Sequence, residues 1–171
     1  RCAPVADQDW ARVGQEVPAR HFGGALWVVP GEAADPAPGA VVVRLDAGLG
    51  FGTGAHPTTA LCLRWLAAHP PVDADVIDWG CGSGILAVAA ARLAARRVWA
   101  LDIDPQALTA THDNAQRNQV AGRIDVRAPD ALPDSPRADL VIANILAPVL
   151  VALAPRLLAA LRQGGALLLS G

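Results

Sequence analysis

The sequence predicts an α/β protein, in which helices cover both faces of a mostly parallel β-sheet. From Gly48 onward, apolar runs of four to five residues alternate with longer amphipathic stretches, as expected for successive βαβ units. The chain has 171 residues, of which 53% are hydrophobic and 18% are charged, so a single domain with a substantial core can form. No apolar run reaches the roughly 20 residues needed to cross a bilayer.

The pattern divides the chain into two parts. Residues 1–47 are predicted to be a linker with two short strands, at 22–29 and 40–46, separated by a Pro- and Gly-rich loop over 30–39. Residues 48–171 are predicted to form the main domain. Its predicted strands are 76–79, 98–101, 124–127, 140–143 and 166–169, and its predicted helices are 59–68, 84–95, 105–118 and 148–162.

Local signals mark several helix ends. Asp104-Pro105 supplies an N-cap and a proline at the first position of the third helix. Gly164-Gly165 is predicted to close the last helix at its C-terminus. These signals fix the ends of the elements independently of the apolar periodicity.

A glycine-rich turn follows the first strand of the main domain. In Val76-Ile-Asp-Trp-Gly-Cys-Gly-Ser-Gly84 the strand runs directly into a helix. Glycines at positions 80 and 82 allow a ligand to approach the backbone, because a Cβ would block it. The alternative is a tight strand-to-helix turn that binds nothing.

Two aspartates follow the next strand, in Leu101-Asp-Ile-Asp-Pro105. Helix capping explains Asp104, since it directly precedes Pro105. For Asp102, 22 residues after Gly80, the sequence offers no comparable structural role. A carboxylate at this strand end accepts hydrogen bonds from both hydroxyls of an adenosine ribose, so Asp102 is predicted to be the ribose ligand.

The turn departs from the dinucleotide pattern GxGxxG. Its sixth position is Ile85 rather than glycine, and no basic residue lies beside it to meet phosphate charge. Asp78, two residues before Gly80, would repel a pyrophosphate but suits a cationic partner such as a sulfonium amino acid. A sulfonium cofactor is therefore favoured over a nicotinamide dinucleotide. A strand-end carboxylate in solvent or a helix cap remains the alternative for Asp78.

Asn144 lies in Ala143-Asn-Ile-Leu-Ala147, at the carboxyl end of the fourth strand, where open α/β sheets bind ligands. An asparagine oxygen and the adjoining carbonyl can accept N–H bonds from an amine and direct its lone pair toward a methyl group. The next helix starts near Pro148, too far away for Asn144 to be its cap. Asn144 is therefore predicted to be a catalytic residue that orients an amine.

A second glycine-rich segment spans residues 46–59 and contains four glycines in nine residues. This composition suits a loop that folds over a ligand, with Gly52 beside the bound molecule and Phe51 as an apolar lid. The alternative for Thr58 or Thr59 is that either merely caps the helix that follows. His56 could act as a base, but a histidine before proline at a helix start is more often a cap or a surface residue.

Charge and cysteine content exclude several classes of protein. Net charge is −2, and all 14 basic residues are arginines that are scattered along the sequence, which argues against a nucleic-acid groove. The three cysteines show neither a CxxC pair nor metal-ligand spacing, and their odd number argues against a disulfide framework. We expect no metal, no direct nucleic-acid contact, no membrane contact and a cytoplasmic location.

Several runs together are specific enough to indicate a family. FGTGAHPTTALCLRWL, VIDWGCGSGILAVAA, LDIDPQAL, DNAQRN and ANILAPVL resemble the PrmA family of bacterial methyltransferases that act on ribosomal large-subunit protein eleven. The glycine turn and Asp102 resemble class I S-adenosylmethionine-dependent methyltransferases in general. The GTGxHPTT loop combined with ANILA is narrower and carries the family assignment.

The resemblance implies a Rossmann-like class I methyltransferase sheet with S-adenosyl-L-methionine as cofactor. It implies cofactor contacts at Thr59, Gly80, Asp102 and Asn144. The implied substrate is the N-terminal and lysine amines of a ribosomal large-subunit protein, methylated by a monomer. It also implies that residues 1–47 trail from an N-terminal substrate-recognition domain and that the last two strands of the sheet lie beyond residue 171. Methylation of another protein or small molecule, and a non-catalytic cofactor-binding fragment, remain alternatives.

Overall fold

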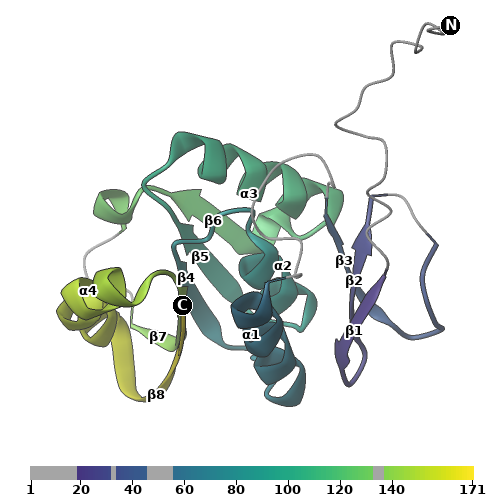
Figure 1. The fold of residues 1–171 in the computed structure, drawn as a ribbon, viewed down its shortest axis with the longest axis horizontal. Helices are drawn as coiled ribbons and strands as arrows, with labels where there is room; N and C mark the ends of the chain where they lie inside the picture. Colours follow the sequence, from purple (N-terminus) through teal and green to yellow (C-terminus); the bar gives the residue numbers. More distant parts are fainter. Residues whose placement is uncertain (1–18, 32–33, 46–55, 133–136) are drawn as a thin grey trace, which may run out of the picture.

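A computed structural model describes residues 19–31, 34–45, 56–132 and 137–171. Its centre is a five-stranded, entirely parallel sheet with the strand order β6-β5-β4-β7-β8 (Figure 1). The sheet strands are β4 (Asp75–Trp79), β5 (Arg97–Leu101), β6 (Ile124–Arg127), β7 (Ala138–Asn144) and β8 (Leu161–Ser170). The helices are α1 (Pro57–Ala68), α2 (Ile85–Arg92), α3 (Pro105–Arg117) and α4 (Ala147–Ala160), with 3₁₀ turns η1 (Ala121–Arg123) and η2 (Pro129–Ala131). The predicted α/β class and the order of the elements are confirmed.

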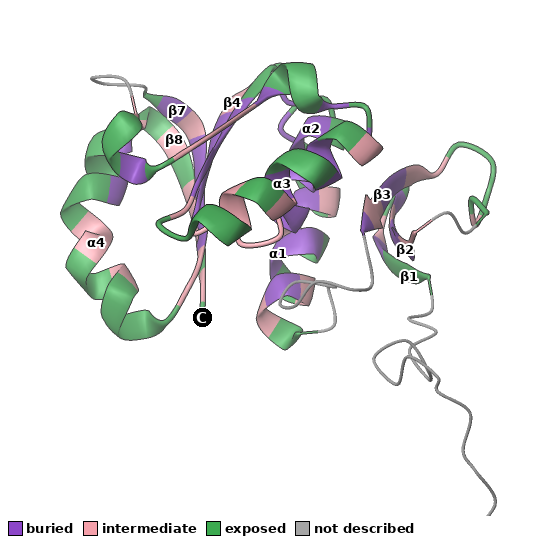
Figure 2. Ribbon diagram, turned by 90° about the horizontal axis from the view of Figure 1, so that it is seen from above, coloured by how far each residue is buried: buried purple, intermediate pink, exposed green. Residues whose placement is uncertain are grey.

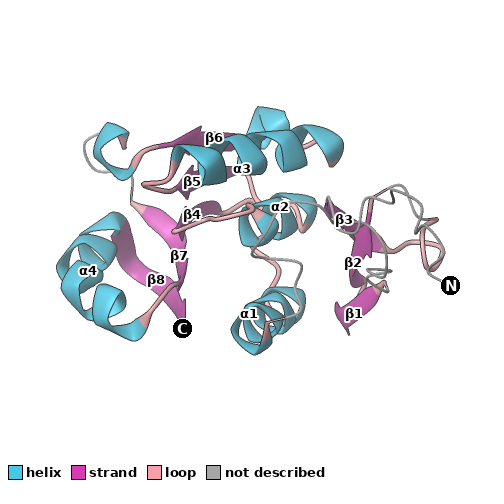
Figure 3. Cartoon of the chain, turned by 45° about the horizontal axis from the view of Figure 1, so that its top comes forward, coloured by secondary structure: helices cyan, strands magenta, loops and turns pink. Residues whose placement is uncertain are grey.

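Both faces of the sheet are covered, which explains why its strands read as continuous apolar runs. In β4, Val76 belongs to a hydrophobic cluster with helices α1 and α2, whereas the next residue, Ile77, belongs to a second cluster that includes Leu157 of α4. Helices α1, α2 and α3 lie on one side of the sheet and α4 on the other (Figure 3). The central strands are buried, and the outer surface of α4 is mostly exposed (Figure 2).

The predicted strand at 22–29 is wrong as a single element. The chain forms two antiparallel strands there, β1 (Arg20–Gly23) and β2 (Leu26–Pro30), which turn at Gly23 and Gly24, both with positive φ. β2 then pairs in parallel with β3 (Val41–Leu45), which corresponds to the strand predicted at 40–46. Periodicity could not reveal the turn, because apolar residues flank both of its glycines.

The small sheet β1-β2-β3 packs against the helices of the main domain. Phe22 and Val43 are buried in the same cluster as Leu63 and Leu66 of α1. Asn118, just after α3, accepts a hydrogen bond from the Arg44 backbone N–H and donates one to the Arg44 carbonyl, both at 2.7 Å. These strands are therefore attached to the main domain through a shared core, and the division of the chain at residue 47 remains a prediction.

Gly164 and Gly165 do not close the last helix. Helix α4 ends at Ala160, and the chain continues directly as β8 from Leu161. The pairing of β7 with β8 shifts between Ala138 and Leu140, and Gly164 has φ +80° within this irregular stretch. A Cβ at Gly165 would lie 2.9 Å from a backbone carbonyl oxygen of β7. The two glycines thus allow a bulge inside a strand.

In the part of the chain that the structure describes, no helix has both the length and the apolar character required to cross a membrane.

Candidate functional site

The glycine turn after β4 is held against the end of β5. The backbone N–H groups of Gly80 and Cys81 both donate to the carbonyl of Leu101, at 2.8 and 2.9 Å. Gly80 has φ +77°, and a Cβ there would lie 2.4 Å from Cγ2 of Ile145, the residue after Asn144. The ends of β4, β5 and β7 therefore meet at the turn. Gly82 has φ +54°, and its Cβ would meet nothing within 4 Å, so the turn borders open space at this residue.

The third glycine of the turn gives a stability prediction. Gly84 has φ +77°, and a Cβ there would lie 2.7 Å from Cγ2 and 3.0 Å from Cα of Thr111. Gly31 also has positive φ, but its Cβ would meet no atom within 4 Å. We expect Gly31→Ala to lower the free energy of unfolding by about 1 kcal/mol and Gly84→Ala by about 3 kcal/mol, measured by urea denaturation. Equal losses would mean that the contact with Thr111 is relieved without cost.

Asp102 lies beside the turn, at the carboxyl end of β5. Its two carboxylate oxygens accept backbone N–H bonds from Gly82 at 2.9 Å and from Asp104 at 3.0 Å. Asp102 therefore has a structural role that the sequence analysis missed, because the contact with Gly82 forms only when β4 and β5 pair. A carboxylate has about four lone-pair sites, so the two that remain can still accept ligand hydroxyls. Asp104 caps α3 as predicted, accepting from Gln106 N–H at 2.9 Å.

Asp78 is buried, with 1% of its surface exposed. Its carboxylate accepts the backbone N–H of Ala87, in the first turn of α2, at 3.0 Å. Of the two interpretations from the sequence, the structure favours a partner for a helix N-terminus over a direct cofactor ligand. Burial raises the pKa of Asp78 to about 7, the bond from Ala87 opposes that rise, and the nearby charge of Asp102 adds to it.

This raised pKa predicts a pH dependence of stability. An unfolded aspartate has a pKa near 3.8, so between about pH 4 and pH 7 the folded chain holds a proton that the unfolded chain has lost. The free energy of unfolding should therefore fall as pH rises through this window, by at most about 4 kcal/mol from this group. In Asp78→Asn, which keeps an oxygen for Ala87, this part of the slope should disappear. Identical slopes in urea titrations of both proteins would contradict the assignment.

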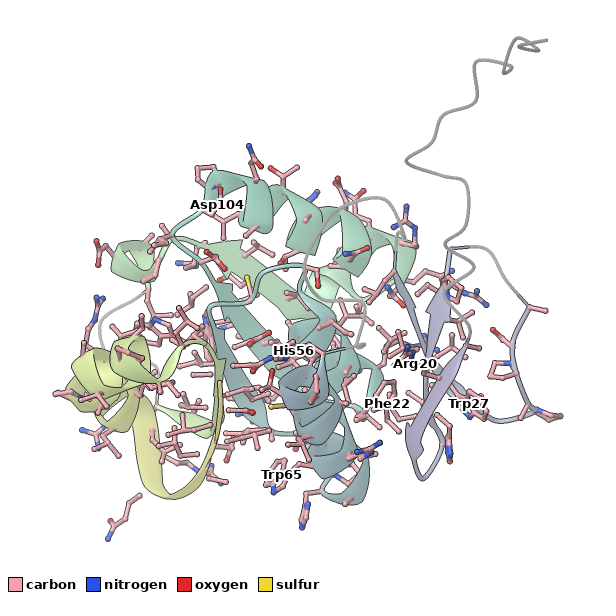
Figure 4. All side chains as sticks on the ribbon, viewed as in Figure 1. Arg20, Phe22, Trp27, His56, Trp65 and Asp104 are labelled. Carbon is pink, nitrogen blue, oxygen red and sulfur yellow. The ribbon has the colours of Figure 1, made fainter. Side chains whose placement is uncertain are left out.

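Thr59 and Asn144 are brought together although they lie 85 residues apart in the sequence. Asn144 ends β7, Thr59 is buried in the first turn of α1, and Asn144 Nδ2 donates to Thr59 Oγ1 at 3.0 Å. This bond turns the amide so that Oδ1 is left as its acceptor. The helix cap is His56, which lies at the start of α1 (Figure 4). Its Nδ1 accepts from the Thr58 N–H at 3.4 Å, so neither threonine caps α1. The prediction that His56 is a cap is confirmed.

Two residues that support the turn were missed by the sequence analysis. Thr111 Oγ1 donates to the carbonyl of Gly82 at 3.0 Å, and Asn114 Nδ2 donates to the carbonyl of Ser83 at 2.9 Å. Both are buried on α3. The signal was present: positions 111, 114 and 118 share the helix face that carries the apolar Leu108 and Ala115, so their polar side chains had to be buried and paired.

Some predicted residues cannot be compared with the structure. Phe51 and Gly52, the proposed lid, lie outside the described residues. Among the residues that are described, no group of three His, Cys, Asp or Glu side chains could hold a metal ion. Cys62 and Cys81 are free and buried, and burial raises the pKa of their thiols to about 11 and about 12.

A family model described as ribosomal protein L11 methyltransferase (PrmA) matches residues 1–171. The chain belongs to this family. The ribosomal protein L11 methyltransferase of Pseudomonas aeruginosa (strain LESB58) is 53% identical over 169 residues, which is 98% of this chain and 57% of that protein. The chain thus spans little more than half the length of this curated relative of the PrmA family.

Solved structures share the fold. The ribosomal protein L11 methylase of Lactobacillus delbrueckii subsp. bulgaricus matches with a TM-score of 0.75 and 34% identity, over 90% of this chain and 79% of that one. An RNA methyltransferase from Salinibacter ruber, crystallised with S-adenosyl-L-homocysteine, matches with a TM-score of 0.55 and 26% identity. That match covers 63% of this chain and 71% of the other. The predicted Rossmann-like methyltransferase sheet is confirmed.

Proposed function

We propose that this chain binds S-adenosyl-L-methionine and belongs to an enzyme that methylates amines of a ribosomal large-subunit protein. The observation that carries the proposal is the meeting of three strand ends: the glycine turn after β4, Asp102 after β5 and Asn144 at the end of β7. Family membership supplies the substrate class.

The described residues fit the nucleoside part of this cofactor. Beside Gly82 there is room for a ligand to reach the backbone, and the Asp102 carboxylate is fixed next to it by two N–H bonds. Asp102 would accept the ribose hydroxyls, and Gly80 and Gly82 would let the ligand lie close to the chain. When bound, the cofactor supplies an electrophilic methyl group on a sulfonium sulfur.

The Thr59–Asn144 pair is suited to hold the substrate amine, which accepts the methyl group. Because Asn144 Nδ2 is directed to Thr59 Oγ1, Oδ1 is available to accept an N–H bond from the substrate amine. That bond orients the nitrogen lone pair, and orientation is the main contribution a protein makes to a direct displacement. The nitrogen oriented by Asn144 would take the methyl group that the bound cofactor supplies, and the methylated amine would then release its proton to solvent.

The amine must be neutral before it attacks. A lysine amine has an unperturbed pKa of about 10.4, and transfer from water into the crevice favours its uncharged form. His56 caps α1 and is exposed, so its geometry gives no support to a role as the base. We propose that desolvation together with Asn144 prepares the nucleophile, in a monomeric cytoplasmic enzyme that makes no direct contact with RNA or membrane.

A direct assay tests this proposal. Two samples are compared: the 171-residue chain, and a protein that has the full length of the family's members. Each is incubated with S-adenosyl-L-methionine and purified ribosomal protein L11, and the mass of L11 is then measured by mass spectrometry. Methyl-sized increments on L11, absent from other proteins in the mixture, are the expected result with the full-length protein. Cofactor binding without methylation of L11 would retain the fold and remove the substrate assignment. Binding of a nicotinamide dinucleotide in its place would remove both.

A further inference from the structure

A cavity of about 320 Å³ opens at the amino ends of the strands, on the edge of the sheet opposite to Asp102 and Asn144. Asp75 begins β4, Arg97 begins β5, and Gly122 and Arg123 lie in the turn η1 that leads into β6 (Figure 1). The residues that line the cavity are Asp75, Arg96, Arg97, Gly122 and Arg123. Arginines that are scattered in the sequence are thus collected around one hollow, and the proposed methyl-transfer site makes no use of it.

Each arginine is held by a different contact. Arg96 is committed to Asp75 through two hydrogen bonds, at 3.0 and 2.7 Å. The Arg97 guanidinium lies 5.4 Å from the ring centroid of Trp99, and Arg123 Nη1 donates to the carbonyl of Ala91 at 3.4 Å. Within the described residues, neither Arg97 nor Arg123 has a carboxylate partner.

The two guanidinium groups approach the cavity from opposite faces of the sheet. Trp99 belongs to the hydrophobic cluster on the α4 side, and Ala91 belongs to the cluster on the α2 side. A guanidinium stacked over an indole keeps its in-plane N–H groups available, and Arg123 uses one of its five. Two guanidinium forks that line one cavity, neither of them paired with a carboxylate among the described residues, match the oxygens of a phosphate group.

The charge balance favours an anion. The Asp75 carboxylate lines the cavity but is neutralised by Arg96. The negative charges of Asp73 and Asp139 also attract Arg96, and Asp139 forms an ion pair with Arg162. Four arginines and three aspartates therefore share this edge, so its net charge is +1. Among the described residues, Arg97 and Arg123 are the two of these arginines without a carboxylate partner.

We propose that this cavity binds a phosphate group carried by a small molecule, such as inorganic phosphate or a free nucleotide. A small ligand fits better than a nucleic-acid backbone, because binding to a backbone needs a basic stripe and the charge here is confined to one hollow. Nothing in this proposal depends on the methyltransferase activity. Gly122 leaves the wall open, since a Cβ there would meet no atom within 4 Å.

Thermal unfolding of the full chain tests the proposal, with phosphate or ADP added at constant ionic strength set by NaCl. At ten times the Kd, bound ligand should raise the Tm by about 3 °C. Arg97→Gln and Arg123→Gln should each weaken the affinity about tenfold or more. The matched control is Arg64→Gln, an exposed arginine on α1 outside the cavity, which should bind phosphate as the wild type does.

Folding of the variants is checked by their midpoints of urea denaturation in the absence of ligand, which should stay close to that of the wild type. An equal rise in Tm in all four proteins would show a general effect of the salt and overturn the proposal. Binding of a single-stranded RNA without any response to phosphate or ADP would also overturn it.

Discussion

Replacement of Asn144 by alanine is expected to lower kcat for methyl transfer at least 100-fold, on the order of the loss seen when one transition-state hydrogen-bond donor or acceptor is removed. Asn144 Oδ1 is the acceptor left after Nδ2 donates to Thr59 Oγ1, so alanine removes the group that we propose orients the amine. The measurement is single-turnover transfer from S-adenosyl-L-methionine to ribosomal protein L11 by the full-length protein. Wild-type kcat in Asn144→Ala would show that the amine is oriented by another group.

Variants of Thr59 test whether its hydroxyl acts by orienting the amide of Asn144. In Thr59→Val the shape is kept but the hydroxyl that accepts from Asn144 is lost, and we expect kcat to fall about tenfold. Thr59→Ser keeps the hydroxyl and should recover most of that loss. Thr59 is buried, so the urea midpoint is measured in parallel. If serine and valine give the same kcat, the hydroxyl does not act through Asn144.

The second large effect is expected at Asp102, where alanine should weaken cofactor binding by about 100-fold or more. Each charge-assisted bond to a ribose hydroxyl contributes about 1.5–3 kcal/mol, and Asp102 is expected to make two. The same substitution frees the N–H groups of Gly82 and Asp104, so part of the loss arises from a less ordered turn. Isothermal titration with S-adenosyl-L-homocysteine measures the affinity.

Its neighbour Asp104 provides the matched control. Asp104→Ala removes the cap of α3 and should lower the free energy of unfolding by about 1 kcal/mol, with cofactor affinity nearly unchanged. Asp102→Asn keeps an oxygen for one of the two N–H groups and should bind more tightly than Asp102→Ala. Unchanged affinity in Asp102→Ala would remove the ribose assignment.

Prediction from the sequence worked best where the determining interactions are local. A proline at the first helical position and a cap one residue before it placed the start of α3, because those contacts span only two or three residues. The start of α1 was predicted two residues too late, at 59 instead of Pro57. The apolar runs located β4 and β5 within one residue, since a strand covered on both faces leaves no polar side to blur the pattern. The glycine turn after β4 could also be predicted, because its glycines are neighbours in the sequence.

Prediction failed where a residue's role depends on a partner distant in the sequence. Gly164 and Gly165 have the composition of a helix end, but the pairing of β8 with β7 uses them for a bulge. The apolar run from Phe22 to Val29 reads as one strand, but the chain turns at Gly23 and Gly24, and β1 and β2 pair with each other.

The sequence by itself determined the α/β class and the order of the elements from α1 onward, because periodicity, glycine content and capping are properties of neighbouring residues. The tertiary structure alone decided that Asp102 also anchors Gly82, that Thr59 turns the amide of Asn144, and that Arg97 and Arg123 line one cavity. Each of these contacts joins side chains from different elements, and their distances are set only when parallel strands align and the helices pack across them.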